Sequence, residues 1–479
     1  MKLSELMKGI SLPEGCDREI AGITCDSRRV AEGWVFVCIK GANVDGHRFA
    51  AQAEKAGAAV IVAEKDTGCV GQLIVPSTRA AWPNMCANWF GEPAQHLHLV
   101  GVTGTNGKTS TTYMLKALLE SCSHKVGLIG TIQNMIGDRV LPSGHTTPDP
   151  YDLQSMLALM VAEGCTYTVM EVSSHALDQD RVGGLVFDSA VFTNLTQDHL
   201  DYHKTMENYF ESKKKLFRQC RKAVVNLDDP STETLISGLT CPIVTYSSHL
   251  NEATYTARNI RPRPDGVDFE LVGIGEIGRV RLPIPGDFSV YNSLAAASCA
   301  LSLGLPFEKV VQTLAQVKGV KGRAEIVPTE RNFTVVIDYA HTPDGLEKIC
   351  ETMKKCSRGR LVTLFGCGGD RDRTKRPLMG AAAAALSDFL IITSDNPRTE
   401  NPNAIIDEIL TGIPVKGTPY KVIVNRVEAI HWAIANAQPG DTILLAGKGH
   451  ETYQILADGC IHLDEREIVA DALRQTAGQ

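Results

Sequence analysis

The chain has 479 residues, which is enough for about three domains of ~150 residues each. Its composition, 43% hydrophobic and 22% charged with 42 glycines, is that of an ordinary α/β protein with a sizeable core. The formal net charge of −7 argues against a nucleic-acid or membrane partner, so an anionic substrate would have to meet local clusters of Arg and Lys. The N-terminus lacks an apolar signal core and no run approaches the ~18 apolar residues of a membrane span, so we expect a cytoplasmic protein.

The N-terminal region, residues 1 to about 93, alternates short apolar runs with polar turns. We predict an apolar segment at Trp34–Ile39, a helix at Phe49–Ala56 and a strand at Ala59–Ala63. Two polar turns, Thr24–Arg29 and Gly41–His47, concentrate Ser, Asn, Asp and Gly. They could hold a polar ligand, although ordinary turn chemistry also explains them.

The stretch VGVTGTNGKTS, residues 100–110, joins a predicted buried strand at Leu97–Val102 to a helix that starts at Lys108. A glycine loop in this position is typical of phosphate binding, because Gly104 and Gly107 let backbone N–H groups approach phosphate oxygens. Lys108 can reach the terminal phosphates and the Thr109 hydroxyl can bind Mg²⁺. Val102 stands where the ordinary Walker pattern has its first glycine. We predict ATP or GTP as the ligand; a plain glycine turn is the alternative.

Two later strands end in polar residues. The predicted strand Tyr167–Val172 carries Glu171 near its end, and Ala190–Thr193 leads into a loop that contains His199. A carboxylate and an imidazole near a phosphate loop could form a second Mg²⁺ position beside Thr109. The alternative for the histidine is a surface or satisfied core position.

Two predicted helices carry further polar residues. The helix Glu207–Cys220 contains the run Lys213–Lys215, which composition alone describes as a solvated basic face. The segment Pro285–Ala297 leads into a helix of small residues with Asn292 in its first turn. The side-chain amide of Asn292 could read an adenine edge.

From residue 328 onward, four predicted strands each run directly into a polar loop. The strands are Phe333–Ile337, Leu361–Phe365, Phe389–Thr393 and Ile443–Leu445, and the loops read DYAHTPD, GCGGDRDRTKR, SDNPRTENP and AGKGHETYQ. Intervening helices such as Met379–Leu386 indicate a doubly wound parallel sheet, whose strand ends present ligand groups along one edge. We predict a cleft there that is rich in Arg and Lys and binds an anion.

Seven motifs, in the order GTNGKT, EVSSH, NLTQDHLDYH, DYAHTPD, GCGGDRD, DNPR and GKGHE, resemble those of the Mur ligase family. With DSR at Asp26–Arg28, the resemblance reaches from there to Glu451. It implies an α/β protein of three domains. Residues 1–94 would form a small mixed α/β domain for the uridine nucleotide, 95–327 a central P-loop-type ATPase domain with a mostly parallel sheet, and 328–479 a Rossmann-like domain for the amino acid.

The resemblance implies a set of residues for each of two substrates. Those for ATP are Gly104, Thr105, Asn106, Gly107, Lys108, Thr109, Ser110, Asn292, Arg323 and Asp338. Those for a UDP-muramoyl dipeptide are Ser27, Asn43, Thr146, Thr147, Ser173, Gln179 and Arg181. The family often has Asn before the paired threonines where this chain has His145, which leaves one substrate contact open.

The resemblance changes the interpretation of one lysine. In the family, a lysine in a Tyr-x-x-Ala-Lys helix is carbamylated, and Tyr209–Lys213 matches that frame with Ser212 in place of Ala. A carbamate would favour Mg²⁺ near Glu171 and His199. The implied catalytic residues are Lys108, Lys213, Glu171 and His199, and the implied metal ligands are Thr109, Glu171, His199 and carbamylated Lys213.

The implied reaction is ATP-dependent addition of meso-2,6-diaminopimelate to UDP-N-acetylmuramoyl-L-alanyl-D-glutamate, a step of peptidoglycan precursor synthesis that serves cell shape and division. ATP phosphorylates the D-glutamyl carboxylate, and the amine attacks the acyl phosphate. Mg²⁺ and Lys108 would offset the repulsion between the two anions. We expect only small-molecule partners, no nucleic acid, no membrane, and a monomer.

The choice of amino acid depends on Arg398, because a guanidinium can bind the distal carboxylate that diaminopimelate has and lysine lacks. A second arginine, Arg371 or Arg376 of the same loop, would also contact the amino acid; we assign Arg371, and Arg376 is the alternative. The implied diaminopimelate residues are Arg371, Asp395, Asn396, Pro397, Arg398, Gly447 and Glu451, with Glu451 placed to hold the distal ammonium.

Three other functions remain open. Two are ligases of the same superfamily, a folylpolyglutamate synthase or a lysine-adding muramyl ligase; DNPR beside GKGHE argues against both. The third is a nucleotide-binding protein without turnover, against which the intact Lys108, Thr109 and Lys213 argue.

Overall fold

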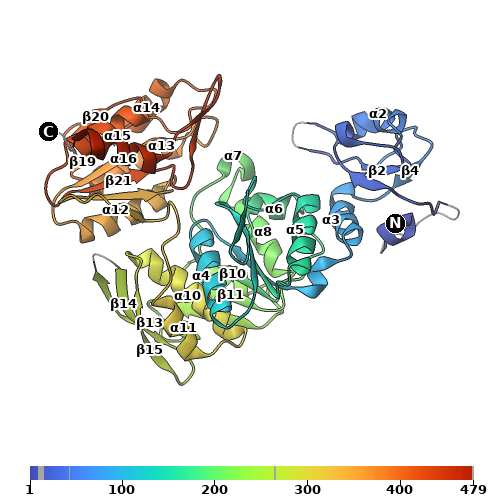
Figure 1. Ribbon diagram of the computed structural model, residues 1–479, viewed down its shortest axis with the longest axis horizontal. Coiled ribbons are helices and arrows are strands. Elements are labelled where there is room, and N and C mark those ends of the chain that lie inside the picture. The colour runs from blue at the N-terminus through green and yellow to red at the C-terminus, as the bar shows by residue number, and fades with distance from the viewer. Residues whose placement is uncertain (9–15, 42–43, 264–265, 477–479) are drawn as a thin grey trace. The chain divides into compact units, whose positions relative to one another are not determined.

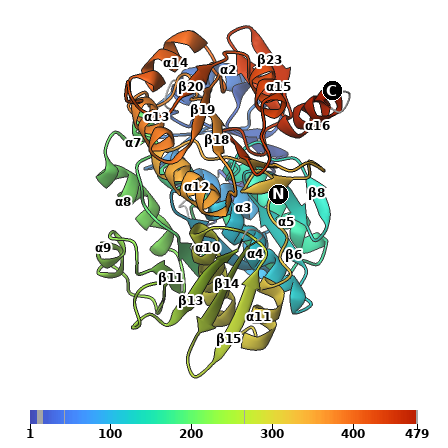
Figure 2. The same ribbon diagram turned by 90° about the vertical axis from the view of Figure 1, so that its left-hand side faces the viewer.

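The computed structural model describes residues 1–8, 16–41, 44–263 and 266–476 (Figures 1 and 2). Contacts between residues divide the chain into two compact units. The first contains Met1–Thr103, Ser123–Ala190 and Ser212–Ala223, and the second contains Gly104–Cys122, Val191–Glu211 and Val224–Gln479. The predicted α/β class is confirmed by helices that alternate with mostly parallel strands.

The N-terminal sheet has helices on both faces, which explains why its two inner strands, β2 and β3, are apolar throughout. In β2, Val35 and Val37 pack with Trp82 on one face, whereas Phe36 packs with Ala53 on the other. The strands pair in parallel in the order β1 (Gly22–Thr24), β2 (Trp34–Val37), β3 (Val60–Ala63) and β4 (Gln72–Ile74). The helices are α1 (Leu3–Leu6), α2 (Ala50–Lys55) and α3 (Thr78–Trp89), with 3₁₀ turns at Ser27–Arg29, Gly46–Phe49 and Pro93–His96.

The central strands follow the order β15-β14-β13-β12-β11-β10-β5-β9-β6-β7-β8. In the first unit, β5 and β6 each pair in parallel with β9, which is buried along its whole length. The strands of this part are β5 (His98–Thr103), β6 (Val126–Ile129), β7 (Asn134–Ile136), β8 (Arg139–Leu141) and β9 (Tyr167–Glu171), and the helices are α5 (Pro150–Ala162) and α6 (Ser174–Asp178). Parallel pairing places the carboxyl ends of β5 and β9 at one edge, where Thr103 and Glu171 lie.

In the second unit, helix α4 packs against α10, whose small side chains allow close approach. The segments here are α4 (Lys108–Ser121), α7 (Leu200–His203), α9 (Thr232–Ile236), β12 (Ile243–Ser247), β13 (Tyr255–Arg263), β14 (Gly266–Val272), β15 (Ile277–Leu282), α10 (Asp287–Ser302) and α11 (Phe307–Leu314). Three elements contain boundaries between the units: β10 (Ser189–Phe192), α8 (Met206–Phe217) and β11 (Ala223–Asn226).

The C-terminal sheet is doubly wound, as predicted. Helices α12, α13 and α14 cover one face and α15 and α16 the other (Figure 2). The strand order is β16 (Glu325–Val327), β17 (Thr334–Asp338), β21 (Thr442–Ala446), β18 (Leu361–Phe365), β19 (Phe389–Ile392) and β20 (Tyr420–Val422), parallel except for β16. The remaining elements are α12 (Pro343–Cys356), α13 (Lys375–Leu386), α14 (Pro402–Leu410), α15 (Arg426–Ala435), β22 (Tyr453–Leu456), β23 (Gly459–His462) and α16 (Glu465–Thr476).

Most predicted elements are confirmed, with small shifts at their ends. The strand Leu361–Phe365 has the predicted bounds. The helix predicted to end at Cys220 ends at Phe217, because the N–H groups of Arg218 and Gln219 donate to carbonyls three residues back and tighten the chain into a turn. Among the described residues, no helix combines the length and the apolar content that crossing a bilayer requires.

Candidate active site

The phosphate loop between β5 and α4 requires its two glycines. Gly104 has φ +150° and Gly107 has φ +85°, conformations that residues with a Cβ rarely adopt. A Cβ at Gly104 would collide with Oγ1 of Thr193, and one at Gly107 with Oδ1 of Asn292. The loop therefore follows its neighbours closely, and it leads the chain into the N-terminus of α4, where the helix dipole favours an anion.

Two side chains from other segments of the second unit hold this loop. The N–H groups of Thr105 and Asn106 donate to the backbone oxygen and to Oδ1 of Asn194, each at 2.9 Å. The side-chain amide of Asn106 donates to Oδ2 of Asp344 at 2.8 Å. These contacts fix the shape of the loop before any ligand arrives.

Two cations lie against the loop. Nζ of Lys108 donates to the carbonyl oxygens of Gly104 and Thr105, both at 2.9 Å. Nη2 of Arg323 donates to Oγ1 of Thr109 at 3.2 Å, and its guanidinium lies 4.6 Å from the ring centroid of Tyr339. The structure thus brings together Lys108, Thr109 and Arg323, and it places Asn292 beside the loop.

Asp338, at the end of β17, fixes the backbone next to Arg323. Its carboxylate accepts hydrogen bonds from the N–H groups of Ala324 and Ala340, both at 2.7 Å. Burial raises the pKa of Asp338, against the opposing effect of the Arg323 charge and these two hydrogen bonds. Asp338 therefore positions Arg323 from within the C-terminal sheet.

In the first unit, the residues predicted for the muramoyl dipeptide form one hydrogen-bonded cluster. Nη1 of Arg181 donates to the carbonyl oxygen of Thr147 at 2.9 Å, and its Nη2 donates to Oε1 of Gln179 at 2.8 Å. The hydroxyl of Thr147 accepts from the N–H of Ser173 at 3.0 Å and donates to the carbonyl oxygen of Glu171 at 2.9 Å. Thr146 shares a 3.0 Å hydrogen bond between hydroxyls with Thr131, which also binds the Glu171 carboxylate.

Glu171 and Lys213 are both buried ionisable residues of the first unit. The carboxylate of Glu171, only 1% exposed, accepts from the N–H and the hydroxyl of Thr131 at 2.9 and 3.0 Å. Lys213 is 2% exposed, whereas Lys214 and Lys215 are half-buried. The interpretation of a solvated basic face is therefore wrong for Lys213, because the 3.6-residue period of α8 turns it inward.

His199 directly precedes α7 in the second unit and has φ +56°, an uncommon conformation for a residue with a side chain. Its Nε2 lies 3.4 Å from Oδ2 of Asp198, and Nε2 of His341 lies 3.8 Å from the same oxygen. Burial would raise the pKa of Asp198, but the charges of His199, His341 and Lys375 outweigh it and lower that pKa to about 2. Within the part of the chain that the structure describes, no group of three or more His, Cys, Asp or Glu could hold a metal ion.

The first of the two polar turns in the N-terminal region is held by its own aspartate. The Asp26 carboxylate accepts from the N–H of Arg28 at 3.0 Å and pairs with its guanidinium, which lowers the pKa of Asp26 to about 2. Ser27 lies in the 3₁₀ turn that this contact caps. Asn43, the other residue predicted for the uridine nucleotide, lies outside the described residues.

The loops after β19 and β21 meet through a buried lysine that the sequence analysis did not single out. Nζ of Lys448 donates to Oδ1 of Asn396 at 3.1 Å and to Oε2 of Glu451 at 2.8 Å, and the Asn396 amide also donates to Glu451 at 2.9 Å. Gly447 is required here, because a Cβ would lie 2.6 Å from Oδ2 of Asp395. Asp395, Asn396 and Glu451 thus form one polar group.

Arg398 lies beside this group with φ +52°. Its Nη1 donates to the carbonyl oxygens of Gly369 and Asn396 at 2.8 and 3.4 Å. The residue before it, Pro397, is buried. Strained conformations of this kind concentrate at ligand sites, where the surrounding structure supports them.

Of the two arginines considered for the loop after β18, Arg376 is fully buried. It donates to Glu400 and Glu408 at 2.8–3.0 Å. Arg371 is exposed and donates to the carbonyl oxygen of Asp370. Arg371 is therefore the one that can reach a ligand.

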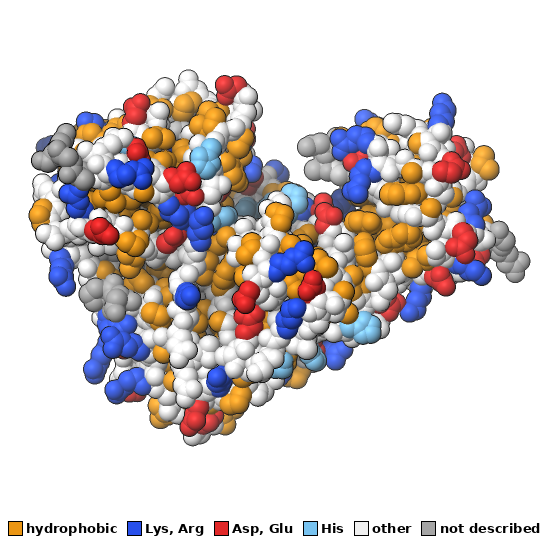
Figure 3. Space-filling view, in the orientation of Figure 1, with side chains coloured by type: hydrophobic (Ala, Val, Ile, Leu, Met, Phe, Trp, Pro, Cys, Tyr) orange, Lys and Arg blue, Asp and Glu red, His pale blue; other side chains and the backbone are white. Residues whose placement is uncertain are grey.

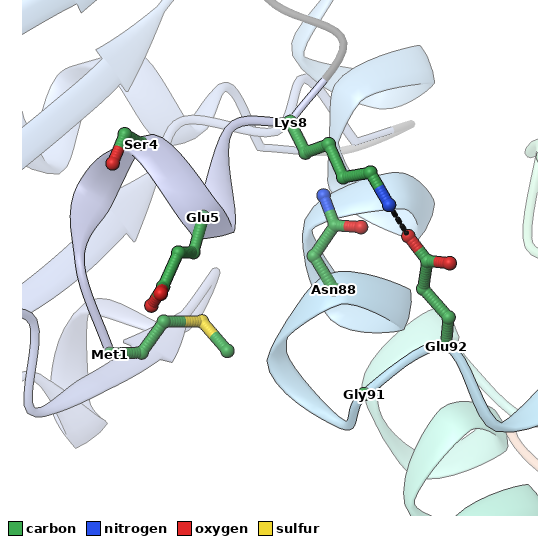
Figure 4. Close-up of a pocket in the computed structure, with 7 residues that line it drawn as sticks. All are labelled: Met1, Ser4, Glu5, Lys8, Asn88, Gly91 and Glu92. Carbon is green, nitrogen blue, oxygen red and sulfur yellow. Dashed lines mark hydrogen bonds and ion pairs between the residues drawn. The ribbon is translucent and has the colours of Figure 1, made fainter.

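A hollow of about 550 Å³ next to α1 contains none of the predicted site residues (Figure 4). Lys8 and Glu92, which line it, already pair with each other at 2.8 Å, and Figure 4 draws this ion pair as a dashed line. Of the other lining residues, Met1, Ser4, Glu5, Asn88 and Gly91, only Glu5 carries a carboxylate, and it already accepts from the N–H of Lys2 at 2.9 Å. We therefore place the candidate site at the strand ends and not here.

Sequence reasoning missed Thr131, Tyr339, Asp344 and Lys448. Tyr339 and Asp344 lie inside DYAHTPD and Lys448 inside GKGHE, so their motifs were the available signal. Thr131 follows β6 with no motif of its own.

Comparison with known proteins covers almost the whole chain. Three family models match: "Mur ligase family, catalytic domain" at residues 19–84, "Mur ligase middle domain" at 102–300 and "Mur ligase, glutamate ligase domain" at 322–449. The UDP-N-acetylmuramoyl-L-alanyl-D-glutamate--2,6-diaminopimelate ligase of Caldanaerobacter subterraneus is 48% identical over 99% of this chain and 100% of its own length.

Solved structures agree with these matches. A structure of a UDP-N-acetylmuramoyl-L-alanyl-D-glutamate--2,6-diaminopimelate ligase is similar with a TM-score of 0.73 and 32% identity, covering 100% of this chain and 99% of the other. The MurF ligase of Thermotoga maritima, solved in complex with ADP, has a TM-score of 0.64 and 19% identity over 95% and 97% of the two chains, and shows likeness of fold alone. This chain belongs to the Mur ligase family.

Proposed function

We propose that this chain is an ATP-dependent amide ligase that joins meso-2,6-diaminopimelate to UDP-N-acetylmuramoyl-L-alanyl-D-glutamate. The observation that carries the proposal is the loop group of Asp395, Asn396 and Glu451 with Arg398 beside it. It offers a cation for the distal carboxylate and carboxylates for the distal ammonium, the two charged groups at the far end of diaminopimelate. The names of the relatives agree with this substrate.

ATP supplies the driving force through its γ-phosphoryl group. The D-glutamyl carboxylate attacks the γ-phosphorus and the bond to the β,γ-bridging oxygen breaks. The products of this step are ADP and the acyl phosphate of the D-glutamyl residue. The amine of diaminopimelate then attacks the acyl carbon, loses a proton, and expels inorganic phosphate to form the amide. Lys108 and Arg323, which lie against the loop, and the N-terminus of α4 would stabilise the phosphate charge, so catalysis would depend on placement and electrostatics.

Mg²⁺ is proposed as the metal because the predicted ligands include hard oxygen donors, the Thr109 hydroxyl and the Glu171 carboxylate. Thr109 and His199 belong to the second unit, and Glu171 and Lys213 to the first. When bound, Mg²⁺ would neutralise charge on the reacting oxygens.

Carbamylation of Lys213 is part of the proposal. Lys213 is 2% exposed, and a carbamate there would replace a buried cation by oxygen ligands of the kind that Mg²⁺ prefers. We expect bicarbonate to raise the activity of CO₂-depleted enzyme, and Lys213→Ala to abolish both the activity and the bicarbonate effect. Lys214→Ala, a change to the adjacent half-buried lysine, is the matched control and should keep both. A fully active Lys213→Ala enzyme would contradict the carbamate.

The nucleotide-sugar substrate is assigned to the remaining predicted residues. The cluster of Thr146, Thr147, Ser173, Gln179 and Arg181 supports binding of the muramoyl dipeptide, because it contains a partly buried cation, Arg181, whose carboxylate partner at 3.1 Å is the exposed Asp149. Ser27 and Asn43 remain predictions for the uridine diphosphate. The domain limits at 94/95 and 327/328, the monomeric state and the cytoplasmic location also remain predictions.

The test is phosphate release from Mg·ATP with the UDP-muramoyl dipeptide, with meso-diaminopimelate or L-lysine as the amine. We expect release with diaminopimelate alone, and its loss in Lys108→Met. Lys116→Gln is the matched control, since Lys116 lies on the same helix but pairs with Glu120 at 2.7 Å. Greater phosphate release with lysine than with diaminopimelate would contradict the proposed amino acid. No phosphate release with either amine would contradict the proposed ligase activity.

A further inference from the structure

Strands β13, β14 and β15 form an antiparallel part of the sheet with one covered and one exposed face. Val267, Phe269 and Leu271 of β14 are buried, on the side where α10 and α11 pack. Figures 1 and 2 both show these three strands side by side with α11 next to them. The alternate residues of the same strands therefore point outward.

The outward face carries arginines in cross-strand rows. Arg258 of β13 and Arg279 of β15 flank Glu270 of β14, and Arg261 and Arg281 flank Asp268. In Figure 3 the blue side chains gather where Figure 1 labels β13 and β14. The arginines of this face are Arg258, Arg261, Arg263, Arg279 and Arg281.

The acidic residue in the middle of each row already has a partner. Asp268 pairs with Arg263, and Glu270 accepts from the side-chain amide of Asn259 at 2.7 Å. Among the described residues, no carboxylate lies within ion-pair distance of Arg279 or Arg281, and both are exposed. Their charge is directed at solvent.

The turn between β14 and β15 adds an apolar tip to this face. It closes through a hydrogen bond from the N–H of Gly273 to the carbonyl oxygen of Glu276 at 2.9 Å, with Gly275 at φ +77°. Ile274 is 79% exposed and Ile277 is 70% exposed. Ile277 lies two residues before Arg279 on the same strand, so both side chains point to the same face.

We propose that the β13–β15 face is a docking surface for an anionic lipid bilayer, with Ile274 and Ile277 entering the interface and Arg279 and Arg281 binding lipid phosphates. A bilayer surface offers apolar and anionic groups at adjacent depths, and an apolar tip flanked by arginines complements both. The whole-chain charge of −7, which led us to expect no membrane partner, averages over the chain and hides this local excess of cations.

The test is flotation of the full chain, without substrates, with vesicles of phosphatidylglycerol and phosphatidylcholine, against vesicles of phosphatidylcholine alone. We expect binding to the anionic vesicles, weakening as NaCl rises from about 0.05 to about 0.5 M because the ions screen the arginines. The double variants Ile274→Ser/Ile277→Ser and Arg279→Gln/Arg281→Gln should each lower the partition coefficient about tenfold or more. Glu276→Gln should raise it, since it removes an opposing charge from the tip.

Matched control variants distinguish binding through this surface from nonspecific binding of the protein to vesicles. Val70 and Val415 are 99% and 105% exposed, so Val70→Ser/Val415→Ser removes as exposed an apolar pair elsewhere. Arg331→Gln/Arg358→Gln removes two exposed arginines from the C-terminal region. Both controls should bind as the wild type does, and all variants should keep the wild-type melting temperature. Absence of wild-type binding to anionic vesicles, or equal losses in the controls, would overturn the proposal.

Discussion

The loops that follow β18 and β19 each lead to an arginine, and the two arginines are held in opposite ways. Arg376, at the start of α13, is fully buried and its guanidinium binds the carboxylates of Glu400 and Glu408. Arg398 is half-buried and donates to backbone carbonyl oxygens. A guanidinium already neutralised by carboxylates supports the fold, whereas one held by neutral carbonyls keeps its charge for an incoming anion.

This difference predicts that substitution of the buried arginine has the largest effect, and that the effect is on the stability of the fold. Arg376→Met should lower the free energy of unfolding by about 3–5 kcal/mol, because Glu400 and Glu408 would be left without their buried partner. Chemical denaturation, followed by circular dichroism, measures the change. A loss below about 1 kcal/mol would show that the two glutamates find solvent or other partners.

Arg398→Met should instead act on substrate choice. We expect kcat/KM for diaminopimelate to fall about 10- to 100-fold, equivalent to about 1–3 kcal/mol, with little change for lysine. Arg371→Gln is the comparison, with a smaller fall because Arg371 is exposed. Steady-state kinetics with both amines measure the ratio; an unchanged preference in Arg398→Met would place the distal carboxylate elsewhere.

The strand ends were predictable from the sequence, whereas side-chain direction was not. An apolar run such as Leu361–Phe365 fixes a buried strand, and parallel strands bring their following loops to one edge, so the DNPR and GKGHE motifs could be placed together. Residue type could not show that Arg376 faces two glutamates or that Lys213 turns inward from a run of three lysines. Those outcomes depend on which elements pack nearby.

The antiparallel strands β13–β15 were not predicted at all. Their outward residues are charged and their inward residues are few, so the alternation is visible only once the register is known. Asp344 shows the same limit, because its contact with Asn106 joins residues that lie 238 positions apart.

The Arg376 pair also predicts a dependence on pH. The guanidinium of Arg376 lowers the pKa of Glu400 from 4.5 to about 2. A lowered pKa stabilises the fold fully above the ordinary value and less as the pH falls from about 4.5 towards 2. The stability advantage of the wild type over Glu400→Gln should therefore shrink across that interval, in denaturant melts at successive pH values. An advantage that stays constant to pH 2 would mean that the pair does not control this carboxyl.

The smallest effect belongs to Arg373, which shares Glu408 with Arg376 but lies at the surface, with its side chain 65% exposed. Solvent screens an exposed pair and the long side chain loses entropy when it is held, so Arg373→Gln should cost less than about 1 kcal/mol. The two variants remove the same kind of group from the same glutamate, and they differ in burial. Denaturation of both variants in parallel thus isolates the contribution of burial. Equal losses in the free energy of unfolding would show that the glutamate partner, and not the burial of the arginine, determines how much an arginine of this loop stabilises the fold.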